Sequence, residues 1–236
     1  MIDLIRGEAI KLRSTRTAIG FLVAGVALIL LLVVVTALAD DPVSVSNKRD
    51  AMTVGPVFIL FVVFGVVGAT GEYRHRTVAP AVLIAPDRLR LLAARMLAYA
   101  VTAAGVAAAM LTLSLVLGAI LMSGEPLAFG DYADLVGGGL LTAALAATLG
   151  VGFGALLGNQ VAGVVTVLIY IFVVDSLIGL AKHALLPYSL GTAAGSLAGL
   201  SGSEAFGFLG SLAVVAGWAL VFVAAGMARE RRREVV

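Results

Sequence analysis

Few side chains in this sequence could carry out chemistry, and one serine is the first candidate. Ser201 lies in the run Gly199-Leu200-Ser201-Gly202. A serine hydroxyl becomes a useful nucleophile only when an adjacent base removes its proton. The two histidines that could supply the base, His75 and His183, both precede Ser201 and lie outside the predicted membrane spans. Serine hydrolase chemistry is therefore disfavoured.

Nucleotide and metal chemistry are also unsupported. A P-loop needs Gly-x4-Gly-Lys followed by Ser or Thr, and none of the lysines, Lys11, Lys48 and Lys182, follows a glycine. The sequence has no cysteine, so thiolate metal sites and disulfides are excluded. We therefore expect no enzyme, and no catalytic, cofactor-binding or metal-binding residues in this chain.

Asp175 is the only charged residue inside a predicted membrane span. An aspartate at the bilayer centre costs about 2.5–3.5 kcal/mol, and such residues often face a cavity or a partner. Asp175 is thus a candidate pathway or interface residue. The alternative is a carboxylate that reaches the outer surface, toward Lys182.

The composition indicates a membrane protein. Hydrophobic residues make up 61% of the 236 residues, charged residues 13%, and the mean hydropathy is +1.10. A soluble domain is nearer half apolar and a quarter charged. The 16 lysines and arginines are scattered between apolar runs, which argues against nucleic acid as a partner.

About 20 apolar residues in a helix cross the hydrocarbon core of a bilayer. Gly158-Asn159-Gln160 interrupts an uncharged run that is too long for one crossing, and this predicts a tight turn. We expect a single all-α transmembrane domain over 1–236, with six spans at 17–39, 51–71, 96–123, 135–157, 161–180 and 205–228.

The distribution of basic residues predicts the orientation. Of the 16 lysines and arginines, only Lys48, Arg49 and Lys182 lie in the segments after spans one, three and five, and the other 13 lie in the opposite set. Cytoplasmic loops carry the excess of Lys and Arg. Both termini are therefore expected in the cytoplasm, as in a multi-pass protein of the bacterial plasma membrane.

Three segments differ from plain spans. In 1–16, apolar residues recur at helical spacing, which predicts either an amphipathic helix lying in the lipid headgroups or a basic flank that sets topology. Segment 181–204 is too rich in Gly and Ser for a span and too apolar for a solvated loop. It predicts a re-entrant segment in the outer leaflet.

The third segment, 72–95, holds an uncharged stretch at 77–85 between two clusters of charge. It predicts either a short apolar helix that a cytoplasmic partner covers or an ordinary basic loop. On span four, a line of glycines at four-residue spacing predicts close helix packing, within one chain or between two. These glycines are Gly150, Gly154 and Gly158.

The run Gly71-Glu72-Tyr73-Arg74-His75-Arg76-Thr77, the later Pro86-Asp87-Arg88 and the N-terminal run from Glu8 to Arg16 resemble the permease of type-2 (ABC-2) ABC exporters. Arg76 departs from the pattern, because many relatives have a glycine there. The resemblance implies a coupling helix at 77–85 that docks on a separate ABC ATPase subunit, and an N-terminal helix beside it. The residues that it implicates are Glu72, Arg76, Thr77, Val82, Leu83, Ile84, Pro86 and Arg88.

The same resemblance implies two ATPase copies that hold ATP and Mg, and a second permease copy or a paralogue. It also implies a drug-like or lipid-like amphipathic substrate, as in multidrug efflux. Two other classes remain open. Six spans and the Gly-x-Ser-Gly of Ser201 also resemble rhomboid intramembrane serine proteases, and a non-transporting membrane scaffold would need no ATPase.

Overall fold

The computed structural model describes residues 2–14, 16–39, 42–74, 88–202 and 206–232. Within these ranges the chain is all-α, with no β-strand. Its elements are α1 (Ile2–Ser14), α2 (Arg16–Ala39), α3 (Val45–Met52), η1 (Gly55–Val57), α4 (Phe58–Arg74), α6 (Arg88–Leu121), α7 (Phe129–Leu157), α8 (Gln160–Ile169), η2 (Tyr170–Val174), α9 (Asp175–Ala181), η3 (His183–Tyr188), α10 (Leu190–Leu197) and α11 (Phe208–Arg232).

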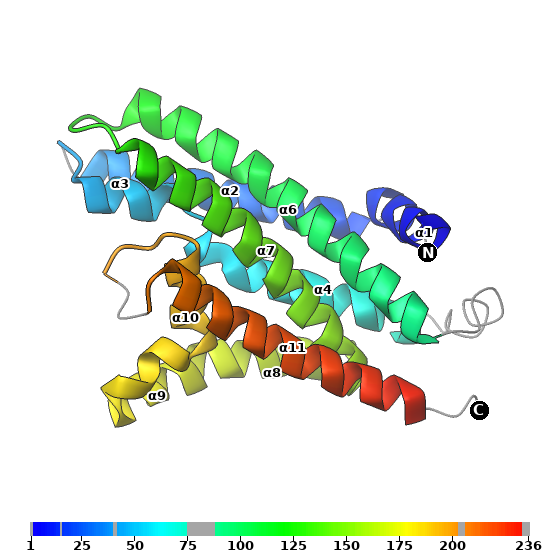
Figure 1. The fold of residues 1–236 in the computed structure, drawn as a ribbon. Coiled ribbons are helices and arrows are strands. Elements are labelled where there is room, and N and C mark those ends of the chain that lie inside the picture. The colour runs from blue at the N-terminus through cyan, green and yellow to red at the C-terminus, as the bar shows by residue number, and fades with distance from the viewer. Residues whose placement is uncertain (1, 15, 40–41, 75–87, 203–205, 233–236) are drawn as a thin grey trace.

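Six helical segments of the described residues are long and apolar enough to cross a membrane. The prediction of an all-α transmembrane protein with six such helices is confirmed. Figure 1 shows that α1 and the last turns of α11 lie at the same end of the bundle, which we call the α1 end. The opposite end, with α3, α9 and α10, is the α3 end.

The helices extend beyond the apolar windows of the sequence. The third long helix, α6, begins at Arg88, and the fourth, α7, begins at Phe129. An apolar window marks the part of a helix that lipid can surround, whereas hydrogen bonding continues the helix past it. The second segment begins early, at Val45, and is broken between α3 and η1. Pro56 lies in the first turn of η1, where its missing N–H costs least.

Helix α7 occupies the centre of the bundle, and its most extensive contacts are with α4, α11 and α6. Against α4 the helix backbones touch. A Cβ atom added to Gly150 would collide with the carbonyl oxygen of Val62, and one added to Gly154 would lie 2.9 Å from the Cβ of Ala69. Glycines at this spacing let two helices approach without intervening side chains. Gly150 and Gly154 therefore pack within one chain.

Other glycines of α7 allow close backbone contact with its other neighbouring helices. A Cβ on Gly152 would lie 2.8 Å from the backbone nitrogen of Val223 in α11, and one on Gly138 would collide with the carbonyl of Leu197 in α10. Gly158, which shares the spacing of Gly150 and Gly154, has a different role. Its φ of 65° ends α7 in the left-handed conformation, and Asn159 then caps α8 by accepting from the amide of Ala162 at 3.1 Å.

We predict that Gly150→Ala destabilises the protein by about 1–3 kcal/mol, because the new methyl group overpacks the contact with α4. Gly137→Ala is the matched control on the same helix, since nothing lies within 4 Å of a Cβ at that position. The control should gain up to about 1 kcal/mol from helix propensity. Denaturant titration in detergent micelles measures both changes. Equal effects of the two substitutions would contradict the packing role.

Candidate functional site

A buried ion pair joins three helices at the α1 end. Nε of Arg95 in α6 lies 3.5 Å from Oε2 of Glu8 in α1, and each residue is 5% exposed. Nη1 of Arg95 also donates to the carbonyl of Ala69 in α4, at 3.4 Å. On the other side, Nζ of Lys11 donates to Oε1 of Glu8 at 2.8 Å. Glu8 therefore holds α1 against α6, while Arg95 reaches α4.

The local sequence explains why α1 buries a carboxylate. Glu8 and Leu12 are one helical turn apart, so they share the face that packs on α6, and both are buried. Arg6 and Ile10 lie on other faces and are exposed. A single face of α1 is therefore fixed to the bundle.

The predicted coupling residues fall around a gap in the described structure. Glu72 lies in the last turn of α4 and Arg88 is the first residue of α6, both at the α1 end. The remaining candidates lie outside the described residues, namely Arg76, Thr77, Val82, Leu83, Ile84 and Pro86. The two helices that lead into and out of this segment are the ones that Arg95 connects.

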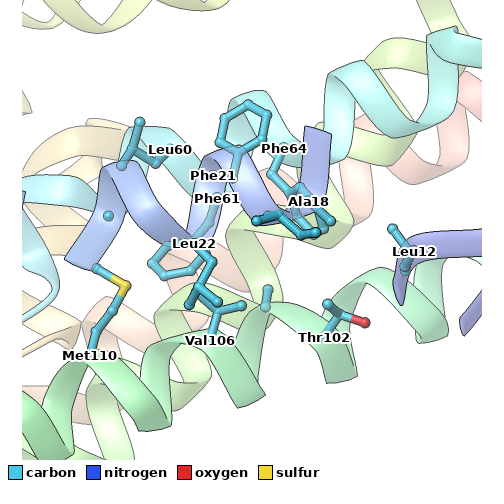
Figure 2. Close-up of a pocket in the computed structure, with 13 residues that line it drawn as sticks. Leu12, Ala18, Phe21, Leu22, Leu60, Phe61, Phe64, Thr102, Val106 and Met110 are labelled. Atoms are coloured by element: carbon cyan, nitrogen blue, oxygen red, sulfur yellow. The ribbon is translucent and has the colours of Figure 1, made fainter. Parts of the chain in front are cut away.

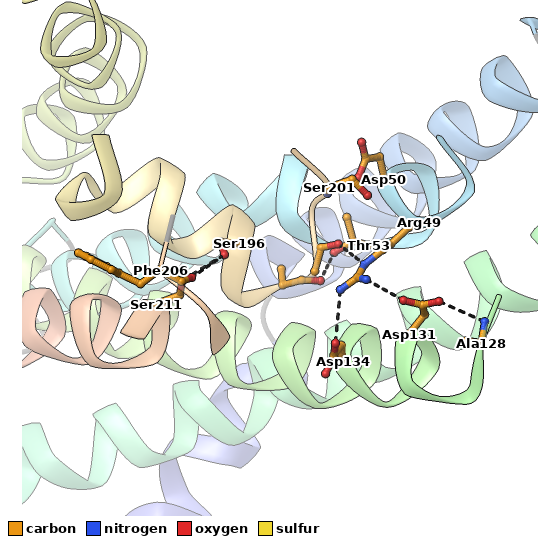
Figure 3. Close-up of polar contacts among 12 residues, drawn as sticks. Arg49, Asp50, Thr53, Ala128, Asp131, Asp134, Ser196, Ser201, Phe206 and Ser211 are labelled. Atoms are coloured by element: carbon orange, nitrogen blue, oxygen red, sulfur yellow. Dashed lines mark hydrogen bonds and ion pairs between the residues drawn. The ribbon is translucent and has the colours of Figure 1, made fainter. Parts of the chain in front are cut away.

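Arg49 organises the α3 end, as Figure 3 shows. Its Nε donates to the carbonyl of Gly199 at 2.8 Å, and its Nη1 lies 2.7 Å from Oδ1 of Asp131 in α7. Its Nη2 lies 3.4 Å from Oδ2 of Asp134, one turn further along the same helix. The fork of the guanidinium thus ties α3 to α7 and to the turn after α10.

Neighbouring residues of α3 add to this clamp. Oδ1 of Asp50 accepts from the backbone N–H of Ser201 at 2.6 Å, and the hydroxyl of Thr53 donates to the carbonyl of Ala198. Lys48, which is 5% exposed, donates to the carbonyl of Glu125 at 2.8 Å. The structure therefore places the backbone of Ser201, through its N–H, in contact with Asp50.

Sequence reasoning did not identify this clamp. A signal was present in the sequence. The segments after the first and third spans are mostly acidic and Lys48-Arg49-Asp50 interrupts them, while the two acids Asp131 and Asp134 are three residues apart. That spacing puts both carboxylates on one face of a helix. The sequence did not say which cation would meet them.

Asp175 faces the short helix α10. Its Oδ2 accepts from the backbone N–H of Gly191 at 2.7 Å, in the first turn of α10, where Ser189 is the N-cap. A carboxylate is stabilised at a helix N-terminus by the unpaired amides and the helix dipole. Both sequence interpretations of Asp175, the pathway and the outer surface, omitted this contact.

Aromatic residues hold the same region. Trp218 of α11 donates from Nε1 to the carbonyl of Tyr188 at 3.0 Å and packs edge-on against Tyr170. Tyr188 in turn packs against Phe206. The segment between the fifth and sixth long helices is therefore fastened to both of them, with α10 buried through Leu190, Ala194 and Leu197.

The polar contacts described above join helices to one another. No group of three or more His, Asp or Glu residues within the described ranges could hold a metal ion. The two ends of the bundle are each fastened by ion pairs that join several helices. These contacts set the relative positions of the helices.

For the α3 end we predict unequal coupling of Arg49 to its two carboxylates. A double-mutant cycle of Arg49→Met with Asp131→Asn should give about 1 kcal/mol, and the cycle with Asp134→Asn less than about 0.5 kcal/mol. Asp131 is the closer and better buried partner, with a side chain 20% exposed against 54% for Asp134. The free energy of unfolding is the measurement. A larger coupling to Asp134 would contradict the geometry.

For the α1 end we predict that Glu8→Leu costs about 3–5 kcal/mol, because Arg95 stays buried without this carboxylate. Adding Arg95→Met should recover most of that loss. Since the sequence has no cysteine, Ile5→Cys gives a single thiol on α1. Its labelling rate should rise in Glu8→Leu and fall again in the double variant. An unchanged rate would mean that Glu8 does not fasten α1.

No protein-family model matches the chain, and no curated protein matches it.

Proposed function

We propose that this chain is the permease subunit of an ATP-driven ABC-2 type exporter in a cell membrane. It would form the translocation path for an amphipathic, drug-like or lipid-like substrate and would carry out no bond chemistry itself. Two copies of a separate ABC ATPase would hold ATP and Mg, and a second permease copy or a paralogue would complete the path.

The observation that carries the proposal is the junction of α1, α4 and α6 through Glu8 and Arg95. The run that resembles the exporter family begins in the last turn of α4, and its later part ends on Arg88 of α6, while the N-terminal run of the resemblance includes the second half of α1. The two parts of the resemblance are far apart in the sequence, yet their helices are joined. A coupling segment needs such a connection to move membrane helices together.

The packing of α4 suggests how a displacement would travel. At its α1 end α4 is contacted by Arg95, and along its length it lies against α7 at Gly150 and Gly154. It also contacts α8, where a Cβ on Gly163 would lie 2.7 Å from Cγ1 of Val66. A push on 77–85 would therefore reach the second and fifth spans, which we propose line the path.

We predict that Leu83→Asp or Ile84→Asp abolishes co-purification of a P-loop ATPase with the chain from native membranes. A charge on the docking face should exclude the partner, while the spans remain unchanged. Leu185→Asp is the matched control, because this side chain is 48% exposed and lies near the α3 end. Mass spectrometry of the companions, with the membrane fraction assayed in parallel, gives the result.

Two outcomes oppose the proposal. If the ATPase is recovered in full with Leu83→Asp, the docking segment lies elsewhere. If the unaltered chain brings down no P-loop ATPase, the exporter assignment fails. Failure of Leu185→Asp to reach the membrane would show that a charge alone disturbs insertion, and the charge-neutral Leu83→Ala would then replace Leu83→Asp.

A further inference from the structure

An apolar cavity of about 180 Å³ lies between α2, α4 and α6, toward the α1 end (Figure 2). The walls come from Phe21 and Leu22 of α2, Phe61 and Phe64 of α4, and Val106 and Met110 of α6. Phe21 and Phe64 meet edge to face, with ring centroids 5.6 Å apart. None of the polar contacts described above uses this space.

The lining offers its occupant no side-chain hydroxyl donor that is not already used. Thr102 is the one polar side chain of the lining, and its hydroxyl donates to the carbonyl of Ala98 at 2.8 Å. A cavity of about 150 Å³ lined by such apolar residues stays dry and accepts a benzene-sized molecule. The occupant must therefore be apolar where it touches these walls.

The shape suits a chain rather than a compact ring. Thr102 and Met110 both line the cavity and are eight residues apart on α6, which corresponds to about 12 Å along the helix axis. Ile19 also lines it and is 54% exposed, so the cavity opens on the outer surface of the bundle. A membrane protein presents that surface to lipid.

Basic residues lie on the helix at one end of the cavity. Leu12 of α1 closes that end, as Figure 2 shows, and follows Lys11 in the sequence. Glu8 pairs with both Lys11 and Arg95. Arg6 is exposed on the same helix, and residues 2–16 contain four basic against two acidic side chains. Each such cation attracts anionic headgroups.

We propose that this cavity binds the acyl chain of an anionic phospholipid whose headgroup lies beside α1. The apolar walls would take the chain, and the cations of α1 would select the headgroup. The inference does not rest on the exporter proposal, since a bound lipid could fix α2 against α4 and α6 in any membrane protein.

Tryptophan quenching by brominated lipids tests it. Trp218 is the only tryptophan and is first replaced by Phe. A reporter is then placed by Ile19→Trp at the mouth of the cavity, or by Val23→Trp one turn along α2. Val23 is 60% exposed and does not line the cavity, so it reports ordinary lipid contact at similar depth. Vesicles contain phosphatidylcholine with brominated phosphatidylglycerol or brominated phosphatidylcholine at equal mole fractions.

We expect the reporter at 19 to favour brominated phosphatidylglycerol about fivefold or more, since one cation near the surface contributes about that factor. The reporter at 23 should show a ratio near one. Adding Arg6→Gln with Lys11→Gln should bring the ratio at 19 close to one. Filling the cavity with Val106→Phe should lower quenching at 19 by either lipid, whereas the exposed Val101→Phe should not.

Equal ratios at 19 and 23 would overturn the proposal. So would a strong but headgroup-independent quenching at 19, because any lipid tail would then fill the cavity. If Val106→Phe fails to fold, Gly25→Ala replaces it. A Cβ at Gly25 lies 3.0 Å from the flexible end of Met110, and unchanged quenching at 19 in this folded variant would exclude the cavity as the site.

Discussion

The direct contact between the backbones of α4 and α7 is the constraint on which the other helix positions depend. Lipid tails are as apolar as the helices, so burial of apolar area gives little reason for helices to associate in a bilayer. Close backbone packing supplies dispersion contacts that lipid cannot match. The glycines of α7 permit this on several faces, toward α4, α10 and α11. The segments of α2, α8–α9 and α11 that suit a membrane span stay largely exposed.

Polar contacts then fix the ends of the bundle, where packing alone would let helices slide. The clamp of Arg49 is partly exposed and joins α3 to elements far away in the sequence. The pair of Glu8 and Arg95 is almost fully buried. Breaking a buried pair on one side costs more than replacing both partners. The α1 end is therefore the more sensitive to single substitutions, and it is also the end where the proposed coupling segment begins and ends.

Much of the architecture could be predicted from the sequence, because the cost of placing charges in lipid acts locally. The long apolar windows indicated six membrane helices, and the Gly158-Asn159 step falls between α7 and α8. Tertiary pairing could not be predicted in the same way. Arg49 and Asp131 are 82 residues apart, and only the fold brings them together. Gly152 was also missed, since it lies off the four-residue line of Gly150 and Gly154 and serves a different neighbour. Residues 75–87, which carry most of the predicted coupling residues, lie outside the described structure.

One wide turn of the fifth span has a consequence for its geometry. At η2 the amide of Asp175 donates to the carbonyl of Tyr170, five residues earlier, so this turn contains one residue more than an α-helical turn. Each added residue rotates the later part of the helix by about 100° around the axis. The part of the fifth span before this turn and the part after it are therefore rotated relative to each other about the helix axis. The first part places Gly163 against α4, and the second places Asp175 beside α10. Deleting a single residue from this turn would rotate the Asp175 carboxylate away from the backbone amide of Gly191, although it would shorten the helix by less than half a turn.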